Sequence, residues 1–198
     1  MILIAVALFA ALSYAVSRSG RGGGDISRET ALLNAATVVQ YASGIRSTVT
    51  RMVLLGTNAA DLDFSSAAGG TDAVFDSSGG GAIFQTIPAS IQTSGALTDE
   101  YRYFPDGNIE GVGTAADDVV MFVPWLTQEI CREINRGLGL PADPPDMGAL
   151  GAAALASGVA IPVDAALCAG CVGEPFICVD SLAVNPDLYM YYHVLVER

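Results

Sequence analysis

The pattern of hydrophobic and polar positions changes along this chain, and its first part is wholly apolar. Residues 1–16, MILIAVALFAALSYAV, contain no charged residue, no glycine and no proline. A helix that is apolar all round has no face suited to water, so we expect this segment to be buried in lipid or in protein. Burial would contribute about 15 kcal/mol or more, at roughly 1.5–3 kcal/mol for each large side chain. Those side chains are Met1, Ile2, Leu3, Ile4, Val6, Leu8, Phe9, Leu12, Tyr14 and Val16.

A glycine-rich stretch, SRSGRGGGD, follows the apolar segment. Gly20, Gly22, Gly23 and Gly24 each disfavour a helix by roughly 1 kcal/mol relative to alanine. The sequence therefore predicts a helix break, with residues 17–24 extended or irregular. A flexible linker with no fixed path is the competing interpretation.

A second, amphipathic helix is predicted from Asp25 or Ser27, either of which can cap it, to Gly56, a suitable C-terminal glycine. Apolar residues recur at steps of three and four, which is the spacing of one helix face. We expect that face to dock on a globular head. Its members are Leu32, Ala35, Val38, Ala42, Ile45, Val49, Met52 and Val53.

The remainder of the chain predicts a head rich in β-structure. Residues 57–92 indicate loops and a hairpin, because glycine and serine clusters separate short apolar pieces. Strands are expected at Tyr101–Phe104, Ile109–Val112, Val119–Val123 and Tyr189–Val196, with a turn at Pro105–Asn108 and an antiparallel arrangement. A helix is expected from Pro124 to Arg136, ended by Gly137, and a short one within Leu150–Val159.

These elements together predict an α+β fold. It would have a long N-terminal helical stalk, apolar in its first half and amphipathic in its second, and a small antiparallel, disulfide-bonded head. The expected units are residues 1–24 (apolar helix and break), 25–56 (docking helix) and 57–198 (head).

Composition excludes one broad class of partner. The formal net charge is −12, and all nine basic residues are arginines. Nucleic-acid affinity depends on basic side chains that neutralise phosphates. We therefore expect no nucleic-acid partner.

Four cysteines, Cys131, Cys168, Cys171 and Cys178, lie in the last third of the chain. An even number in an exported chain is typical of two disulfides, and three connectivities are possible. We favour a bond from Cys131 to one of the other three. A zinc site would favour two close pairs of ligands, and the Cys168–Cys171 spacing also occurs in redox dithiols.

No pattern of catalytic residues stands out. His193 is the only histidine, and it lies among tyrosines in a predicted strand, which indicates a structural role. Five acidic residues near the predicted sheet are alternative calcium ligands, although a solvated acidic face is the simpler interpretation: Asp99, Glu100, Asp106, Asp117 and Asp118. No phosphate-binding or dinucleotide fingerprint is present. We expect no cofactor, no metal and no enzymatic activity.

The start of the chain bears on its export. A cleaved secretion signal would carry basic residues before the apolar run, and none is present. A simple membrane anchor would leave Arg18, Arg21 and the head in the cytoplasm by the positive-inside tendency, which does not suit disulfides. We therefore expect that a short basic leader preceded Met1 and was removed, leaving the apolar segment on the mature protein.

This arrangement resembles that of the type IV pilins and pseudopilins over residues 1–56. Those proteins begin with an apolar helix after leader removal, continue into an amphipathic helix and carry a β-rich head, often closed by a C-terminal disulfide. One departure is Ala5, where the family usually has glutamate. A few residues missing before Met1, a divergent branch and a minor subunit are three open explanations.

The resemblance implies a structural subunit of an extracellular, cell-surface filament, anchored in the inner membrane before assembly. The ten large apolar side chains of residues 1–16 would form the polymerisation core. Identical subunits and a pilus or secretion machinery would be the partners. A minor pilin or pseudopilin, and a membrane-anchored periplasmic binding domain, are the alternatives.

Overall fold

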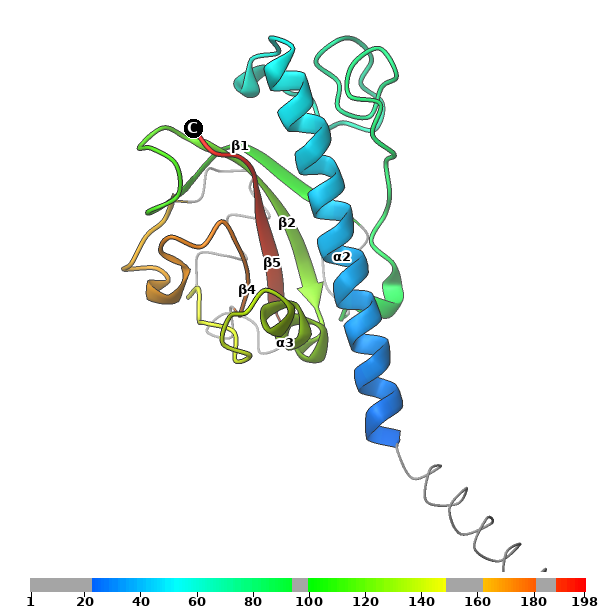
Figure 1. Ribbon diagram of the computed structural model, residues 1–198, viewed down its shortest axis with the longest axis vertical. Helices are drawn as coiled ribbons and strands as arrows, with labels where there is room; N and C mark the ends of the chain where they lie inside the picture. The colour runs from blue at the N-terminus through cyan, green and yellow to red at the C-terminus, as the bar shows by residue number, and fades with distance from the viewer. Residues whose placement is uncertain (1–22, 94–99, 149–161, 181–187) are drawn as a thin grey trace, which may run out of the picture.

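The computed structural model describes residues 23–93, 100–148, 162–180 and 188–198 (Figure 1). A long helix, α2 (Gly23–Leu54), and a shorter one, α3 (Gln128–Gly137), lie against a five-stranded sheet. The strands lie in the order β3-β1-β2-β5-β4. Their bounds are β1 (Arg102–Ile109), β2 (Asp118–Leu126), β3 (Pro162–Val163), β4 (Phe176–Asp180) and β5 (Tyr189–Val196).

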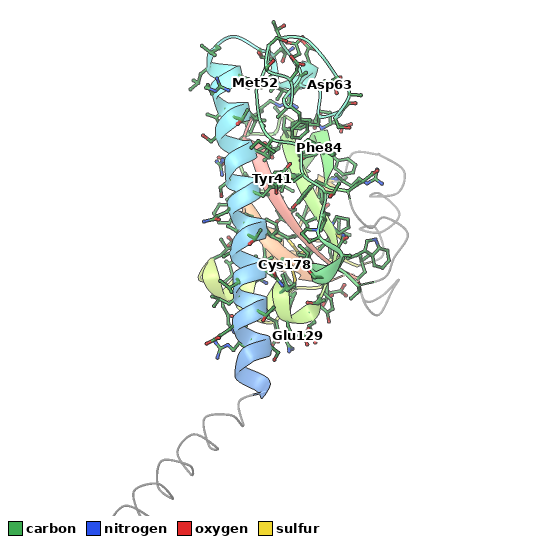
Figure 2. All side chains as sticks on the ribbon, turned by 90° about the vertical axis from the view of Figure 1, so that its right-hand side faces the viewer. Tyr41, Met52, Asp63, Phe84, Glu129 and Cys178 are labelled. Carbon is green, nitrogen blue, oxygen red and sulfur yellow. A yellow bond between two sulfur atoms is a disulfide. The ribbon has the colours of Figure 1, made fainter. Side chains whose placement is uncertain are left out.

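This architecture corrects the predicted fold class. The sheet is mixed, because β3 pairs with β1 in the parallel sense while the other pairs are antiparallel. The described helices do not form a stalk with an apolar half, since α2 packs along the sheet through one face (Figure 2). Over the described ranges, no helix is both long and apolar enough to cross a membrane.

Helix α2 includes Gly23 and Gly24, the first residues that the structure describes, although we expected both to be irregular. Residues 17–22 lie outside the described part, and the predicted break at Gly20 and Gly22 stays a prediction.

The buried face of α2 agrees closely with the predicted stripe. There are two exceptions: Leu32 is 52% exposed, with Ala31 at the buried position instead, and Val53 is only partly buried. Gly56 adopts a φ of 107°, a left-handed conformation suited to glycine after a helix. The residues of α2 buried against the sheet and α3 are Ala31, Ala35, Val38, Ala42, Ile45, Val49 and Met52.

The turn predicted at Pro105–Asn108 was wrong. One strand, β1, runs through these residues, and its register with β2 shifts between Phe104 and Gly107. A Cβ atom at Gly107 would lie 2.7 Å from a methyl group of Val120, so only glycine lets the two strands approach there. Turn-forming residues therefore produce a β-bulge inside a strand.

Pro124 was also misassigned, because it belongs to β2 and not to a helix. Proline cannot donate a ladder hydrogen bond, and the pairing of β2 with β5 shifts between Val123 and Leu126. Trp125, at the shift, has a φ of 62°. Helix α3 starts after this irregularity, with the Thr127 hydroxyl capping it by accepting from the Ile130 amide.

Both faces of the sheet are buried. Helices α2 and α3 cover one face, where Met121, Val123 and Tyr191 pack. Phe122, Met190 and Tyr192 point to the other face, which packs against Met147, Val163 and the cysteines of the 168–171 loop. The β5 bounds match the predicted 189–196 strand, while β3 and β4 were not anticipated. The predicted 150–159 helix lies outside the described residues.

Residues 57–93 pass beside the C-terminal half of α2 as loops with two short 3-10 helices, Ala59–Asp61 and Ala89–Ile91. The predicted hairpin is replaced there by a single isolated parallel bridge between Asp63 and Ala73. Figure 2 shows Tyr41 and Phe84 on the same side of α2, and the Tyr41 hydroxyl donates to the Ile83 carbonyl at 3.4 Å. This segment therefore extends the cover over the helix.

Candidate functional site

A groove of about 560 Å³ lies between the N-terminal half of α2 and helix α3. Most of its lining is apolar, and several of its side chains come from successive turns of α2. The groove volume falls within the range of about 300–1,000 Å³ that is common for ligand sites. It is lined by Arg28, Leu32, Ala35, Ala36, Val39, Gln40, Glu133, Ile134, Arg136, Gly137 and Leu138.

The charged groups at this groove are paired with one another. The Glu133 side chain is 6% exposed, and its Oε1 accepts from Arg28 Nε at 3.2 Å. The same oxygen accepts from Nη1 of Arg136, one turn further along α3. These two charge-assisted contacts satisfy the nearly buried carboxylate. This triad ties α2 to α3 and leaves no carboxylate unpaired in the groove.

Two adjacent leucines mark the exposed side of α2 near the groove. Leu32 lines the groove and is 52% exposed, while Leu33 is 66% exposed and does not line it. An exposed large apolar side chain is unremarkable by itself. Leu32 is different because it continues an apolar surface formed by Val39, Ile134 and Leu138.

One disulfide anchors α3 to the sheet. It joins Cys131 of α3 to Cys178 of β4, two residues 47 positions apart in the sequence. The preference for a Cys131 bond to a later cysteine is thus confirmed. Asn135, one turn along α3, accepts from the Cys178 amide and donates to the Cys178 carbonyl, both at 2.8 Å. At Cys178, the outer edge of β4 is therefore satisfied by a side chain, whereas at Asp180 it bonds to the backbone of Pro145 and Met147.

Replacing Asn135 by alanine is expected to lower the free energy of unfolding by about 2–3 kcal/mol. Asn135 is fully buried, so the variant leaves a buried N–H and a buried C=O of Cys178 without partners, at roughly 1–3 kcal/mol for each group. Urea denaturation of the full chain in mild detergent measures the change. Asn108→Ala is the control, because the Asn108 amide makes only two long contacts of 3.4 Å. An equal loss in both variants would contradict the expectation.

The second disulfide joins Cys168 to Cys171, three positions apart. Both sulfurs are buried, and the Cys171 carbonyl accepts from the Tyr192 hydroxyl at 3.4 Å. The following Gly173 amide donates to the Glu110 carbonyl at 2.7 Å. This disulfide therefore closes a loop that covers the sheet face opposite the helices. All four cysteines are oxidised.

His193 is buried on β5 and faces α2. Its Nδ1 lies 2.7 Å from the Tyr191 hydroxyl, and its ring packs 5.4 Å from that of Phe176. Burial lowers the pKa of His193 to about 4, with a further contribution from the positive charge of Arg46. The structural role predicted for this residue is consistent with that packing.

The depressed pKa of His193 predicts an acid-sensitive fold. The unfolded chain binds the proton at higher pH than the folded chain, so stability falls as pH drops from about 6.5 towards 4. The expected loss between pH 7 and pH 5 is about 2 kcal/mol. Urea denaturation at both pH values measures it, and His193→Gln should remove most of the difference. A wild-type chain equally stable at pH 7 and pH 5 would contradict this expectation.

The ten residues of the predicted polymerisation core lie outside the described residues: Met1, Ile2, Leu3, Ile4, Val6, Leu8, Phe9, Leu12, Tyr14 and Val16. Gly20 and Gly22 of the predicted break also lie outside, whereas Gly23 and Gly24 lie in α2. The apolar segment therefore joins the described fold at the end of α2 that carries the groove.

The acidic residues weighed as calcium ligands do not gather into one site in the described ranges. Asp118 is fully buried and accepts from the amides of Arg198, at 2.9 Å, and Ile109, at 3.5 Å. Burial raises the pKa of the Asp118 carboxyl. Glu100 pairs with Arg102 at 3.1 Å, and Asp99 lies outside the described residues. Within those residues no three acidic, histidine or cysteine side chains form a group able to hold a metal ion.

Sequence reasoning missed the groove because it placed Leu32 on the buried stripe of α2. The neighbouring pair Leu32-Leu33 was the available signal, since two consecutive leucines cannot both lie on one narrow helix face. Glu133 and Arg136 were a second signal for this site, because residues three apart on a helix are neighbours and can form an ion pair. No protein-family model, curated protein or solved structure matches this chain.

Proposed function

We propose that this chain is a structural subunit that assembles into an extracellular filament through its apolar N-terminal segment. One observation carries the proposal: sixteen residues without a charge, Met1–Val16, precede a disulfide-bonded domain. Exposing ten large apolar side chains to water is strongly unfavourable. Copies of the same segment packed together would remove that cost without any other partner.

The disulfides support a location outside the cytoplasm, where such bonds persist. A chain that carries both a hydrophobic segment and oxidised cysteines fits a protein held in the inner membrane and then assembled on the cell surface. An assembly machinery would then be a transient partner. The design is similar to that of the type IV pilins, although Ala5 stands where they usually have glutamate.

Assembly also gives a role to the basic residues beside the apolar segment. Acidic residues dominate after Arg51, and like charges on neighbouring heads repel one another. Arg18 and Arg21, next to the apolar segment, are placed in the sequence to meet acidic groups of adjacent copies. The function needs no catalytic residue and no cofactor.

Electron microscopy of protein sheared from cells that make the chain tests this function. The expected result is thin filaments that dissociate in detergent into a chain of about 20.4 kDa. Non-reducing peptide mapping of the same material should recover the two disulfides. A chain that remains monomeric after mild detergent extraction, with no filaments on the cells, would instead favour a membrane-anchored binding domain.

A further inference from the structure

We infer that the groove between α2 and α3 receives residues 1–16 of a second copy of this chain. The inference rests on the proposed function and specifies which surface of the domain contributes to assembly. Three features of the groove carry it: its apolar lining, its internally paired charges and its place at the start of α2.

The lining matches an apolar occupant. Val39, Ile134 and Leu138 present aliphatic groups to the groove. Ala35 and Ala36 have small side chains, so they leave space on the α2 side of the groove between Leu32 and Val39. Residues 1–16 supply leucine, isoleucine, valine and phenylalanine and no charge. Aliphatic side chains against an aliphatic wall remove apolar area from water on both partners, at about 25 cal/mol for each Å².

The charges of the groove also suit a neutral occupant. Glu133 is already bonded to Arg28 and Arg136, so an apolar segment laid beside it separates no ion pair. An unpaired carboxylate in this place would strongly oppose such docking. Arg28 and Arg136 each use one N–H on Glu133, and their side chains stay 66% and 45% exposed. Their remaining donors can therefore stay in water while an apolar segment lies beside them.

Geometry favours a second copy over the same chain. Residues 17–22 alone join Val16 to Gly23, so the chain's own segment would have to reverse direction within them to lie along α2. A groove also covers only one side of its occupant, while residues 1–16 are apolar on every side. In an assembly, other copies cover the remaining sides. Folding back within one chain would leave them in water.

Leu32→Asp and Leu33→Asp form a matched pair of full-length variants that tests the inference. Both leucines are exposed neighbours on α2, and only Leu32 lines the groove. Neither change buries a charge in the free domain, so both variants should fold. We expect Leu32→Asp to reduce filament yield by about tenfold or more, because docking would desolvate the new carboxylate. Leu33→Asp should assemble nearly as the unmodified chain does. Equal effects of the two changes, in either direction, would overturn the inference.

Cysteine crosslinking identifies the occupant directly. Chains carrying Leu8→Cys are mixed with chains carrying Ala36→Cys, co-assembled and mildly oxidised. Ser47→Cys is the control, because it lies on a similar face of α2 three turns further on and does not line the groove. We expect a disulfide-linked dimer with Ala36→Cys and little with Ser47→Cys.

Three outcomes overturn this inference and leave the filament proposal standing when filaments form. They are equal crosslinking to both positions, no crosslinking at all, and a crosslink seen only within one chain that carries both Leu8→Cys and Ala36→Cys. The absence of filaments from the unmodified chain would overturn the proposed function itself. The two failures are therefore distinguishable.

Discussion

Replacing Leu8 by aspartate is expected to abolish filament formation. The change places a carboxylate in the middle of an apolar segment, and burying an unpaired charge costs several kcal/mol in every subunit. The charge would repeat at each subunit, so even a modest penalty is multiplied along a filament. Electron microscopy and sedimentation of sheared protein measure the loss.

Leu54→Asp is the matched control for this prediction. Leu54 is the last residue of α2 and is 81% exposed, so aspartate there stays in water. We expect its filament yield to remain close to that of the unmodified chain. Normal yield from Leu8→Asp would show that residues 1–16 are not buried between copies.

The sequence predicted best those elements whose patterns are local and long. The period of α2 identified six of its seven buried positions because one helix face repeats every three to four residues over many turns. Strand β5 was predicted with the same bounds, since its aromatic and branched residues favour strands. In both elements tertiary packing reinforces the local preference.

Local signals failed where the same residue types serve two purposes. Pro105-Asp106-Gly107-Asn108 has the composition of a turn, yet β1 continues through it because Gly107 accommodates the close approach of Val120. Pro124 can open a helix or interrupt a strand ladder. The pairing of β2 with β5 selects the second role. Such choices depend on which distant strand lies alongside.

Short and non-local elements were beyond prediction. Strand β3 has two residues and pairs with β1 in parallel over Asn108 and Ile109. It is too short to show a periodic pattern from which a strand could be predicted. The groove likewise combines side chains about a hundred positions apart, as in the Arg28 to Glu133 ion pair. The cysteines indicated that α3 is tied to the C-terminal region, but two candidate partners besides Cys178 remained.

The two disulfides are expected to contribute unequally to stability. One lies on the helix-covered face of the sheet and the other on the opposite face, so removing each in turn tests each face separately. The Cys131–Cys178 bond closes a loop spanning 47 positions, while the Cys168–Cys171 bond spans three. In the chain-entropy account, these loops correspond to about 4 kcal/mol and about 2 kcal/mol of constraint on the unfolded chain. The longer bond also fixes α3 on β4.

Cys131→Ala combined with Cys178→Ala should therefore lower the free energy of unfolding by about 4 kcal/mol, and the melting temperature by about 10 °C. Cys168→Ala combined with Cys171→Ala is the matched variant, with an expected loss of about 2 kcal/mol. All four side chains are buried, so the small cavities left by alanine are similar and cancel in the comparison. Thermal and urea denaturation of the full chains in mild detergent measure both losses.

Because α3 forms one wall of the groove, the variant without the Cys131–Cys178 bond should also assemble less well at temperatures where it is still folded, whereas the variant without the Cys168–Cys171 bond should not. Equal losses of stability, or normal assembly by the first variant, would show that the bond between α3 and β4 does not hold the groove in shape.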